Sequence, residues 1–281
     1  MTFIVHGATG AQGAPVLAAL TAAGHVATAA VRDVSQVRGT PAVAVDYDSV
    51  DSLVAAYRGA EGVFVHLPLG APQQVAGFAR TIGEAIAAAQ PARVVFSTSG
   101  AQTGVAGSEG GAADVLVQAL DRSGVSFAVV EPRLYLENLL LPVVVGPARE
   151  EGVLRYPLRA DFPASWSSHL DVADVVRALL TDHAVTGVVA VGALPALLGD
   201  DLAAGFSRHL GREVRYEGLT PDEFGRSITP LFGEQAAAGV VQFYASRQTS
   251  SGDVIGEDSS AQRLLGISPR TVQEWLHAMG V

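Results

Sequence analysis

Residues 3–13 read Phe3-Ile4-Val5-His6-Gly7-Ala8-Thr9-Gly10-Ala11-Gln12-Gly13. An apolar run ends at Gly7, glycines recur at every third residue as far as Gly13, and a helical pattern opens directly after them. Only glycine lets a backbone turn this tightly and come this close to a ligand. The N–H groups at the start of the following helix then face a bound phosphate, helped by the helix dipole. The stretch predicts a strand-turn-helix unit that holds a dinucleotide, and a tight turn without a ligand is the alternative.

The composition is that of a well-buried globular chain with an acidic balance. Its 281 residues suffice for one large domain or two modest ones. A hydrophobic content of 49% with 16% charged residues indicates a packed core and not disorder. The net charge of −10 and the scattered basic residues argue against a nucleic-acid-binding surface. All 18 basic residues are arginine, which excludes any mechanism that needs a lysine ammonium.

Several other classes of protein are also disfavoured. The chain has no cysteine, so disulfides and thiol chemistry are absent. We expect no secretory signal, because Met1-Thr2 leads straight into the first strand, and no membrane span, because the apolar run at 139–145 is short and broken by Pro142. No group of His, Asp and Glu shows the spacing of metal ligands, so no metal site is expected. A cytoplasmic location fits these features.

Strand and helix patterns alternate about six times in the first half of the chain. Largely apolar strands in this alternation predict a parallel sheet covered on both faces, a Rossmann-type doubly wound α/β fold. The expected strands after the first are residues 25–31, 42–45, 63–67, 93–97 and 125–130. We expect the glycine-rich segment 104–111 to be mobile.

The regular alternation stops after Asn138. The expected later elements are strands within 152–158, 187–191 and 213–216, a helix at 171–181, helices within 221–248 interrupted near Pro230 and Gly233, and a closing helix at 269–279. These elements predict an NADP-binding Rossmann domain of residues 1–150, to which 171–192 return. Residues 151–170 and 193–281 are expected to form a small C-terminal α+β substrate-binding lid.

The carboxyl ends of parallel strands converge on one edge of the sheet, where ligands bind in this class of fold. We therefore expect a cofactor to contact the glycine turn and the residues that follow each strand. The candidate cofactor-binding residues are Gly7, Thr9, Gly10, Ala11, Gln12, Gly13, Arg32, Asp46, His66, Leu67, Pro68, Ser97, Thr98 and Pro132.

Arg32, at the end of the second expected strand, bears on which dinucleotide is bound. An acidic residue at this place would bond the ribose hydroxyls of NAD, whereas an arginine suits the 2′-phosphate of NADP. Arg32 thus favours NADP(H). Asp33 follows directly, and its carboxylate makes this preference ambiguous. A solvated arginine at the strand end is the alternative.

With these residues identified, the chain resembles the NmrA-like branch of the atypical short-chain dehydrogenase/reductases. The matching pieces are residues 7–13, 31–32, 97–99, 131–139, 169–175 and 264–272. The N-terminal motif belongs to a wide superfamily, and the stretch from Tyr135 to Leu139 and the C-terminal piece narrow the resemblance. It implies a Rossmann domain, a preference for NADP(H), and either redox sensing or reduction of quinones, dyes and similar unsaturated acceptors.

The chain departs from the wider superfamily at the catalytic pair. Ordinary members use a Tyr-x-x-x-Lys pair, in which the lysine depresses the tyrosine pKa and holds the ribose. That pair cannot exist in a chain without lysine, and the lysine of the isoflavone-reductase-like branch is missing too. Sugar-epimerase chemistry, which uses the same pair, is thereby disfavoured.

Tyr135 and His169 are the candidate catalytic residues if the acceptor needs a proton donor. The resemblance places Tyr135 after the strand that ends near the nicotinamide, and His169 where related proteins bring the second domain to the pocket. An aromatic pocket wall is the alternative for Tyr135. A helix-entry histidine with a local hydrogen bond is the favoured alternative for His169.

Other polar residues receive less definite interpretations. His6 lies inside the first strand and is expected to be a satisfied core histidine. Ser97 and Ser99 are expected to bond the nicotinamide ribose or a substrate carbonyl, or to cap a turn. Glu131 and Arg133 flank Pro132, and an ion pair at the pocket and solvated loop charges both remain open.

The sequence thus supports an NADPH-dependent reductase of a small conjugated acceptor, a quinone, enone or imine, that works without a Tyr-Lys pair. An NADP(H)-binding sensor that regulates another protein is the first alternative. An enzyme of a biosynthetic pathway with a non-redox reaction on the same fold is the second. The expected partners are a small-molecule substrate and either a second copy of the chain or a protein partner, without nucleic acid or membrane.

Overall fold

The computed structural model describes residues 2–104 and 111–281, so most of the glycine-rich segment expected to be mobile lies outside the described residues. The chain forms two compact units. The first comprises Met1–Pro132, His169–Val191 and Glu257–Ile267, and the second Arg133–Ser168, Gly192–Gly256 and Ser268–Val281. Residues 133–150 therefore make their contacts within the second unit, and 257–267 make theirs within the first.

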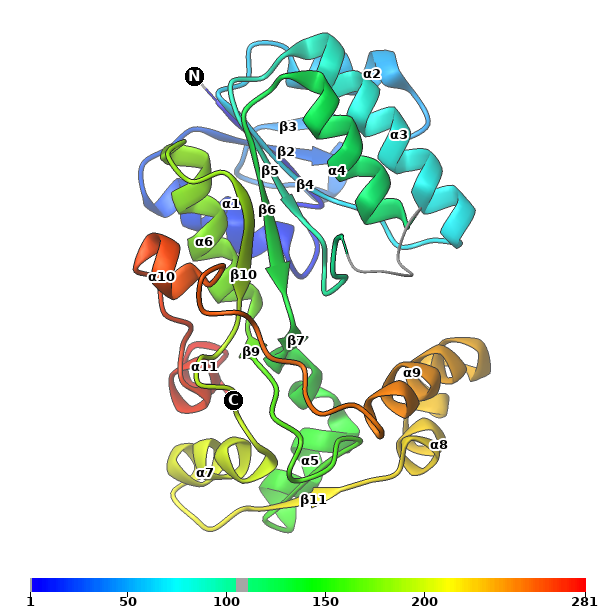
Figure 1. The fold of residues 1–281 in the computed structure, drawn as a ribbon, viewed down its shortest axis with the longest axis vertical. Coiled ribbons are helices and arrows are strands. Elements are labelled where there is room, and N and C mark those ends of the chain that lie inside the picture. The colour runs from blue at the N-terminus through cyan, green and yellow to red at the C-terminus, as the bar shows by residue number, and fades with distance from the viewer. Residues whose placement is uncertain (1, 105–110) are drawn as a thin grey trace. The chain divides into compact units, whose positions relative to one another are not determined.

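The first unit is built on a parallel sheet in the strand order β10-β6-β5-β4-β1-β2-β3 (Figure 1). Its strands are β1 (Phe3–His6), β2 (Ala27–Val31), β3 (Ala42–Ala44), β4 (Gly62–His66), β5 (Val94–Ser97), β6 (Phe127–Pro132) and β10 (Gly187–Val191). All neighbours pair in parallel; in β1, Phe3 is paired with Ala27 on one side and with Gly62 on the other. The Rossmann-type doubly wound fold predicted from the alternating pattern is confirmed.

Helices cover both faces of this sheet. The helices α2 (Val50–Tyr57), α3 (Pro72–Ala89) and α4 (Ala112–Ser123) pack side by side, and α1 (Gly13–Ala22) packs against α6 (His169–Thr181). Ile4, Val65 and Phe96 of the sheet share one buried cluster with Leu53 of α2 and Ile82 of α3. Two short elements complete the unit, the 3-10 turn η1 (Val34–Gln36) and the helix α10 (Ala261–Leu265).

The second unit combines short strands with helices. Its strands are β7 (Leu134–Tyr135), β8 (Val153–Tyr156), β9 (Trp166–Ser167) and β11 (Arg215–Gly218); its helical elements are η2 (Leu136–Leu140), α5 (Pro142–Glu150), α7 (Gly199–Leu210), α8 (Pro221–Phe232), α9 (Glu234–Arg247) and α11 (Val272–Ala278). The strands form two parallel pairs, β8 with β11 and β7 with β9. Tyr156, Trp166, Phe224 and Tyr244 lie together in its core.

The expected break near Pro230 is wrong, because α8 continues through this proline to Phe232. Proline lacks an N–H and so removes one hydrogen bond of the helix, but α8 still runs two residues beyond Pro230 before it ends. The chain breaks only at Gly233, whose φ of +82° ends α8 before α9 begins.

Arg93, directly before β5, is the largest buried cation of the first unit. Its guanidinium donates to the carbonyl oxygen of Leu179 at 3.0 Å, to the hydroxyl of Ser126 at 2.8 Å and to the carbonyl oxygen of Val185. These bonds tie the end of α6 and the segment before β10 to the middle of the sheet. The arginine is therefore a structural group and not a member of the ligand-binding edge.

Replacing this buried cation tests its structural role. We expect Arg93→Met to lower the free energy of unfolding by about 3 kcal/mol, because buried acceptors lose their donors. Arg80→Met, an equal change on an exposed position of α3, is the control and should leave stability nearly unchanged. Urea unfolding measures both, and equal small losses would contradict the assigned role.

Candidate functional site

The glycine turn lies between β1 and α1, at the carboxyl edge of the sheet. Gly7 has a φ of +57°, and Gly10 closes the turn by donating its N–H to the carbonyl oxygen of Gly7 at 2.8 Å. The backbone N–H groups of Ala11, Gln12 and Gly13 donate to no group in the described part of the chain. Three such donors in succession at a helix start form a ready site for an anion.

The three glycines are needed for different reasons. A Cβ on Gly7 would overlap the imidazole of His66, and a Cβ on Gly13 would overlap the backbone of His6 and Gly7. A Cβ on Gly10 would meet only the carbonyl oxygen of Gly7, at 3.3 Å. A side chain at Gly10 would thus meet a single atom of the protein, whereas the other two glycines permit close packing of the turn itself. This division of roles fits a dinucleotide whose pyrophosphate passes over the second glycine.

The side chain of Gln12 connects the turn to the end of β5. Its amide nitrogen donates to the Ser99 hydroxyl and its amide oxygen accepts from the Ser97 hydroxyl, each at 2.8 Å. Ser99 has a φ of +57°, a conformation that residues other than glycine seldom adopt. The sequence analysis names Gln12 and Ser97 as candidate cofactor-binding residues, but it does not predict that their side chains are bonded to each other across 85 residues.

His6 is the satisfied core histidine that the sequence predicts. It is fully buried, and its Nδ1 and Nε2 are bonded to the hydroxyls of Tyr47 at 3.0 Å and Tyr57 at 2.8 Å. Burial, and then the nearby His66, lowers the pKa of His6 to about 3. The imidazole is therefore neutral and holds β1 to the turn after β3 and to the end of α2.

Two further histidines of the first unit are held neutral. Burial lowers the pKa of His66, whose Nε2 is buried and finds no partner among the described residues. Burial, and then His66, lowers the pKa of His169 to about 4. His169 is the first residue of α6. A neutral imidazole is a weaker acid than an imidazolium, so His169 would serve as a hydrogen-bond donor more readily than as a strong acid.

The ends of β2 and β3 place Arg32 and Asp46 in solvent. Asp33 accepts bonds from the backbone and hydroxyl of Ser35 and from Gln36, and the Ser35 hydroxyl bond is the main cause of its lowered pKa. Arg32 forms no ion pair with any residue that the structure describes. The carboxylate of Asp33, which makes the preference for NADP(H) ambiguous in the sequence, thus caps η1 by accepting hydrogen bonds from its residues.

The remaining predicted residues occupy several strand ends. His66 and Ser97 end β4 and β5, and Thr98 donates its hydroxyl to the carbonyl oxygen of Ala101 at 2.6 Å. Pro132 ends β6 and pairs with Val191 of β10. Tyr135 belongs to the second unit, where it pairs with Ser167 and is half-buried.

The charges that flank Pro132 differ in their surroundings. Glu131 is 5% exposed, and its carboxylate accepts from the backbone N–H of Thr103 at 2.8 Å and from the hydroxyl of the same residue. Arg133 lies 3.6 Å from Asp253 in the second unit. Of the two interpretations that the sequence left open, solvated loop charge does not apply to Glu131, which is buried and bonded to Thr103.

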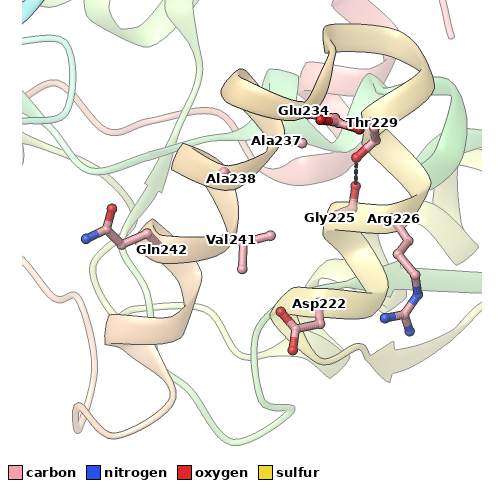
Figure 2. A pocket seen from close by; sticks show the side chains of 9 residues that line it. All are labelled: Asp222, Gly225, Arg226, Thr229, Glu234, Ala237, Ala238, Val241 and Gln242. Carbon is pink, nitrogen blue, oxygen red and sulfur yellow. Dashed lines mark hydrogen bonds between the residues drawn. The ribbon is translucent and has the colours of Figure 1, made fainter.

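Two hollows occur that sequence reasoning missed. One, of about 450 Å³, lies between α8 and α9 and is lined by small side chains, with charged groups around it (Figure 2). The other, of about 300 Å³, lies in the first unit between the turns after β4 and β5 and the start of α4. The second hollow shares Leu67, Pro68 and Thr98 with the predicted cofactor set. The second hollow leaves no mark in the sequence, since it is assembled from the separate segments 67–75, 98–102 and 111–114.

Within residues 2–104 and 111–281, no group of three or more His, Asp and Glu side chains could hold a metal ion. Over the same residues, no helix has the length and apolar character needed to cross a membrane.

The strand order, which reverses between β1 and β4, and the glycine turn after β1 define a Rossmann-type α/β protein. The model of the NmrA-like family matches residues 1–276, and the chain belongs to that family. It is 30% identical over 249 residues to the NAD(P)H azoreductase of Xenophilus azovorans, covering 86% of each protein.

Solved structures with the same fold include two reductases. The NADPH-dependent quinone oxidoreductase QOR2 of Escherichia coli, complexed with NADPH, has a TM-score of 0.72 at 20% identity and full coverage of both chains, 100% each. The triphenylmethane reductase of Citrobacter sp., complexed with NADP(H), has a TM-score of 0.80 at 16% identity, with 99% of this chain and 100% of that chain covered. Likeness at this level of identity establishes the shared fold.

The contrast between two glycines gives a test of the turn geometry. We expect Gly13→Ala to lower the free energy of unfolding by about 2 kcal/mol or more, because its Cβ meets backbone that cannot move aside. Gly10→Ala should change stability by less than about 1 kcal/mol, since its Cβ meets one atom only, the carbonyl oxygen of Gly7 at 3.3 Å. Chemical denaturation compares the two variants, and a Gly10→Ala loss as large as that of Gly13→Ala would refute the assignment.

The buried neutral histidines predict a loss of stability in acid. The unfolded chain binds protons near pH 6.5 while His6 and His169 stay neutral until about pH 3 and 4, so stability falls as the pH drops through this window. Each such histidine contributes about 2 kcal/mol of loss between about pH 6.5 and 4.5.

Urea unfolding of His6→Gln at both pH values tests this dependence. The variant should lose about 2 kcal/mol less than the wild type on acidification, because one titrating group is gone. His183→Gln, at an exposed position, should retain the wild-type dependence. An unchanged acid loss in His6→Gln would contradict the assigned protonation state.

Proposed function

We propose that the chain is an NADPH-dependent reductase that transfers a hydride to a small conjugated acceptor without a Tyr-Lys pair. The observation that carries this proposal is the row of unpaired backbone N–H groups at Ala11, Gln12 and Gly13 beside the open space above Gly10. Such donors stabilise a pyrophosphate without any charged side chain. The chain has no lysine to take that role.

The candidate cofactor residues fit a dinucleotide in extended form. Gly7 to Gly13 would hold the pyrophosphate, Arg32 and Asp46 the adenosine end, and His66 to Pro68 the adjoining wall of the crevice. Ser97, Thr98 and Pro132 would hold the nicotinamide end. The buried Nε2 of His66 supports this fit, since it is an unused polar atom of the described chain that adjoins the turn.

Arg32 supports NADPH over NADH. Its guanidinium has no ion-pair partner among the described residues, and the neighbouring carboxylate of Asp33 is occupied by Ser35 and Gln36. A guanidinium at this strand end matches the charge and geometry of a 2′-phosphate.

The relatives support the type of reaction. Their names describe reductases of azo compounds, quinones and triphenylmethane dyes that use NADPH or NAD(P)H. All three acceptors are conjugated, electron-poor systems that can accept a hydride. We propose an acceptor of this kind for the present chain.

The bound nicotinamide would supply the hydride; a neutral acceptor would take up that hydride and one proton, and a cationic acceptor the hydride alone. The protein's contribution is to orient the acceptor, to exclude water and to provide a hydrogen-bond donor where negative charge develops. Tyr135 and His169 remain our candidate proton donors. An acceptor that yields a stabilised anion needs no strong acid, which agrees with a neutral His169.

A substitution at Gly10 tests the cofactor site. We expect Gly10→Val to abolish NADPH binding and acceptor-dependent NADPH oxidation, because the side chain fills the space proposed for the pyrophosphate. Its thermal transition should stay near that of the wild type, which separates lost binding from lost folding. Calorimetric titration with NADPH measures the effect, and retained binding would mean that the turn holds no pyrophosphate.

A substitution at Arg32 tests the preference for NADPH. Arg32→Ala should weaken NADPH binding by about tenfold to a hundredfold and NADH binding by less than about threefold, because only NADPH carries the 2′-phosphate. Arg38→Ala, at an exposed arginine after η1, is the matched control. Equal losses for the two dinucleotides would overturn the assignment of Arg32.

A further inference from the structure

The hollow at the start of α4 lies wholly within the first unit and has the make-up of a small-molecule site. Its volume of about 300 Å³ is at the lower end of the range for such sites, which run from about 300 to 1,000 Å³. Leu67, Leu69 and Val75 provide apolar walls from one side, and Ala112 provides one from the other. Leu69 is fully exposed, so a large apolar side chain stands in solvent beside the hollow.

The hydroxyl of Ser99 adds a hydrogen-bond donor to this apolar hollow. Its oxygen accepts from the Gln12 amide, and its proton is donated to no residue that the structure describes. Gln12 is fixed in this orientation because its amide oxygen accepts from Ser97, whose own oxygen accepts from the N–H of Ser99 at 3.4 Å. The proton of Ser99 is therefore left available for a ligand.

The backbone at Ser99 indicates that this arrangement is imposed by its surroundings. A serine at φ +57° adopts a costly conformation that persists only where neighbouring contacts hold it. Glycine occupies such positions without strain, yet this chain places a hydroxyl there. The hydrogen-bonded chain Ser97–Gln12–Ser99 is the contact that holds it.

The charge of the lining selects among acceptors. Asp114, in the first turn of α4, is its single ionisable side chain among the described residues. Its carboxylate accepts from the N–H of Gly104 at 3.1 Å and so stays beside the hollow. A negative charge near an apolar wall repels anionic ligands and favours neutral or cationic ones.

We propose that this hollow is the acceptor site of the reductase, and that it takes a flat, neutral or cationic conjugated molecule whose heteroatom accepts a hydrogen bond from Ser99, a donor positioned by Gln12. The proposal rests on the proposed function and names the substrate class of that function. Because the lining adjoins the predicted cofactor residues Leu67, Pro68 and Thr98, an acceptor held there would lie next to the dinucleotide crevice. Sulfonated or carboxylated acceptors should bind poorly.

The test uses two probes that differ by one charge, 1,4-naphthoquinone and 1,4-naphthoquinone-2-sulfonate. Each is titrated calorimetrically into full-length protein loaded with NADP⁺, so that no turnover occurs and binding alone is read. The chain contains no cysteine and no lysine, which removes the usual side chains that add to quinones. The neutral probe should bind about tenfold more tightly than the sulfonate.

Variants of Asp114 test the charge selection. Asp114→Asn should reduce the preference for the neutral probe by about fivefold, since the amide keeps an oxygen for Gly104 but carries no charge. Asp121→Asn is the matched control on an exposed position of the same helix and should preserve the preference. Equal effects of the two variants, or equal binding of both probes by the wild type, would overturn the charge selection.

Variants of Ser99 and Gln12 test the donor. Ser99→Gly removes the hydroxyl at a position where glycine is unstrained, and should weaken naphthoquinone binding by about fivefold to tenfold. Gln12→Leu should weaken it as well, and the double variant should bind no more weakly than Ser99→Gly, because both changes act through one hydroxyl. Additive losses, or unchanged binding by Ser99→Gly, would refute the positioning role.

A parallel titration separates this proposal from the proposed function. NADPH is titrated into the wild type and Ser99→Gly, and both should bind it with similar affinity. Absence of NADPH binding to the wild type would defeat the reductase proposal itself. Normal NADPH binding, with naphthoquinone affinity indifferent to Ser99 and Asp114, would defeat only the acceptor site.

Discussion

The structure of the first unit depends on the close approach of α1 to the end of β1. The backbone of Gly13 lies so near to that of His6 and Gly7 that no side chain fits between them. This contact sets the direction of α1 and leaves the N–H groups of Ala11 to Gly13 unpaired at the sheet edge. One steric constraint thus fixes both the packing of the helix and the position of the unpaired donors.

Two sets of side-chain hydrogen bonds hold this turn and the strand before it in place. Gln12 links the turn to β5 through two serine hydroxyls, and His6 links the strand before the turn to two tyrosines. Both links are made of neutral groups, in a chain whose cations are all arginines. Binding in this region would therefore be governed by backbone donors and hydroxyls, with Arg32 as the cation at the adenosine end.

The sequence predicted the features that depend on local pattern. The apolar strands, the glycine spacing and the buried His6 are all readable because period, backbone freedom and side-chain polarity act over a few residues. The sequence did not predict three other features: the link from Gln12 to Ser97 and Ser99, the close approach of His66 to Gly7, and the hollow at α4. Each joins segments distant in sequence. The hydrogen bond from Ser35 to Asp33 is local, but the sequence analysis did not predict it.

The most direct test of the account is the rate of NADPH oxidation by the protein across a panel of quinones, enones, imines and azo compounds, compared with free NADPH. The account predicts strong acceleration by at least one class of neutral conjugated acceptor, with formation of the reduced product in equal amount. Tight binding of NADPH with no acceleration by any acceptor would contradict it, and would identify the chain as a dinucleotide-binding protein without reductase turnover.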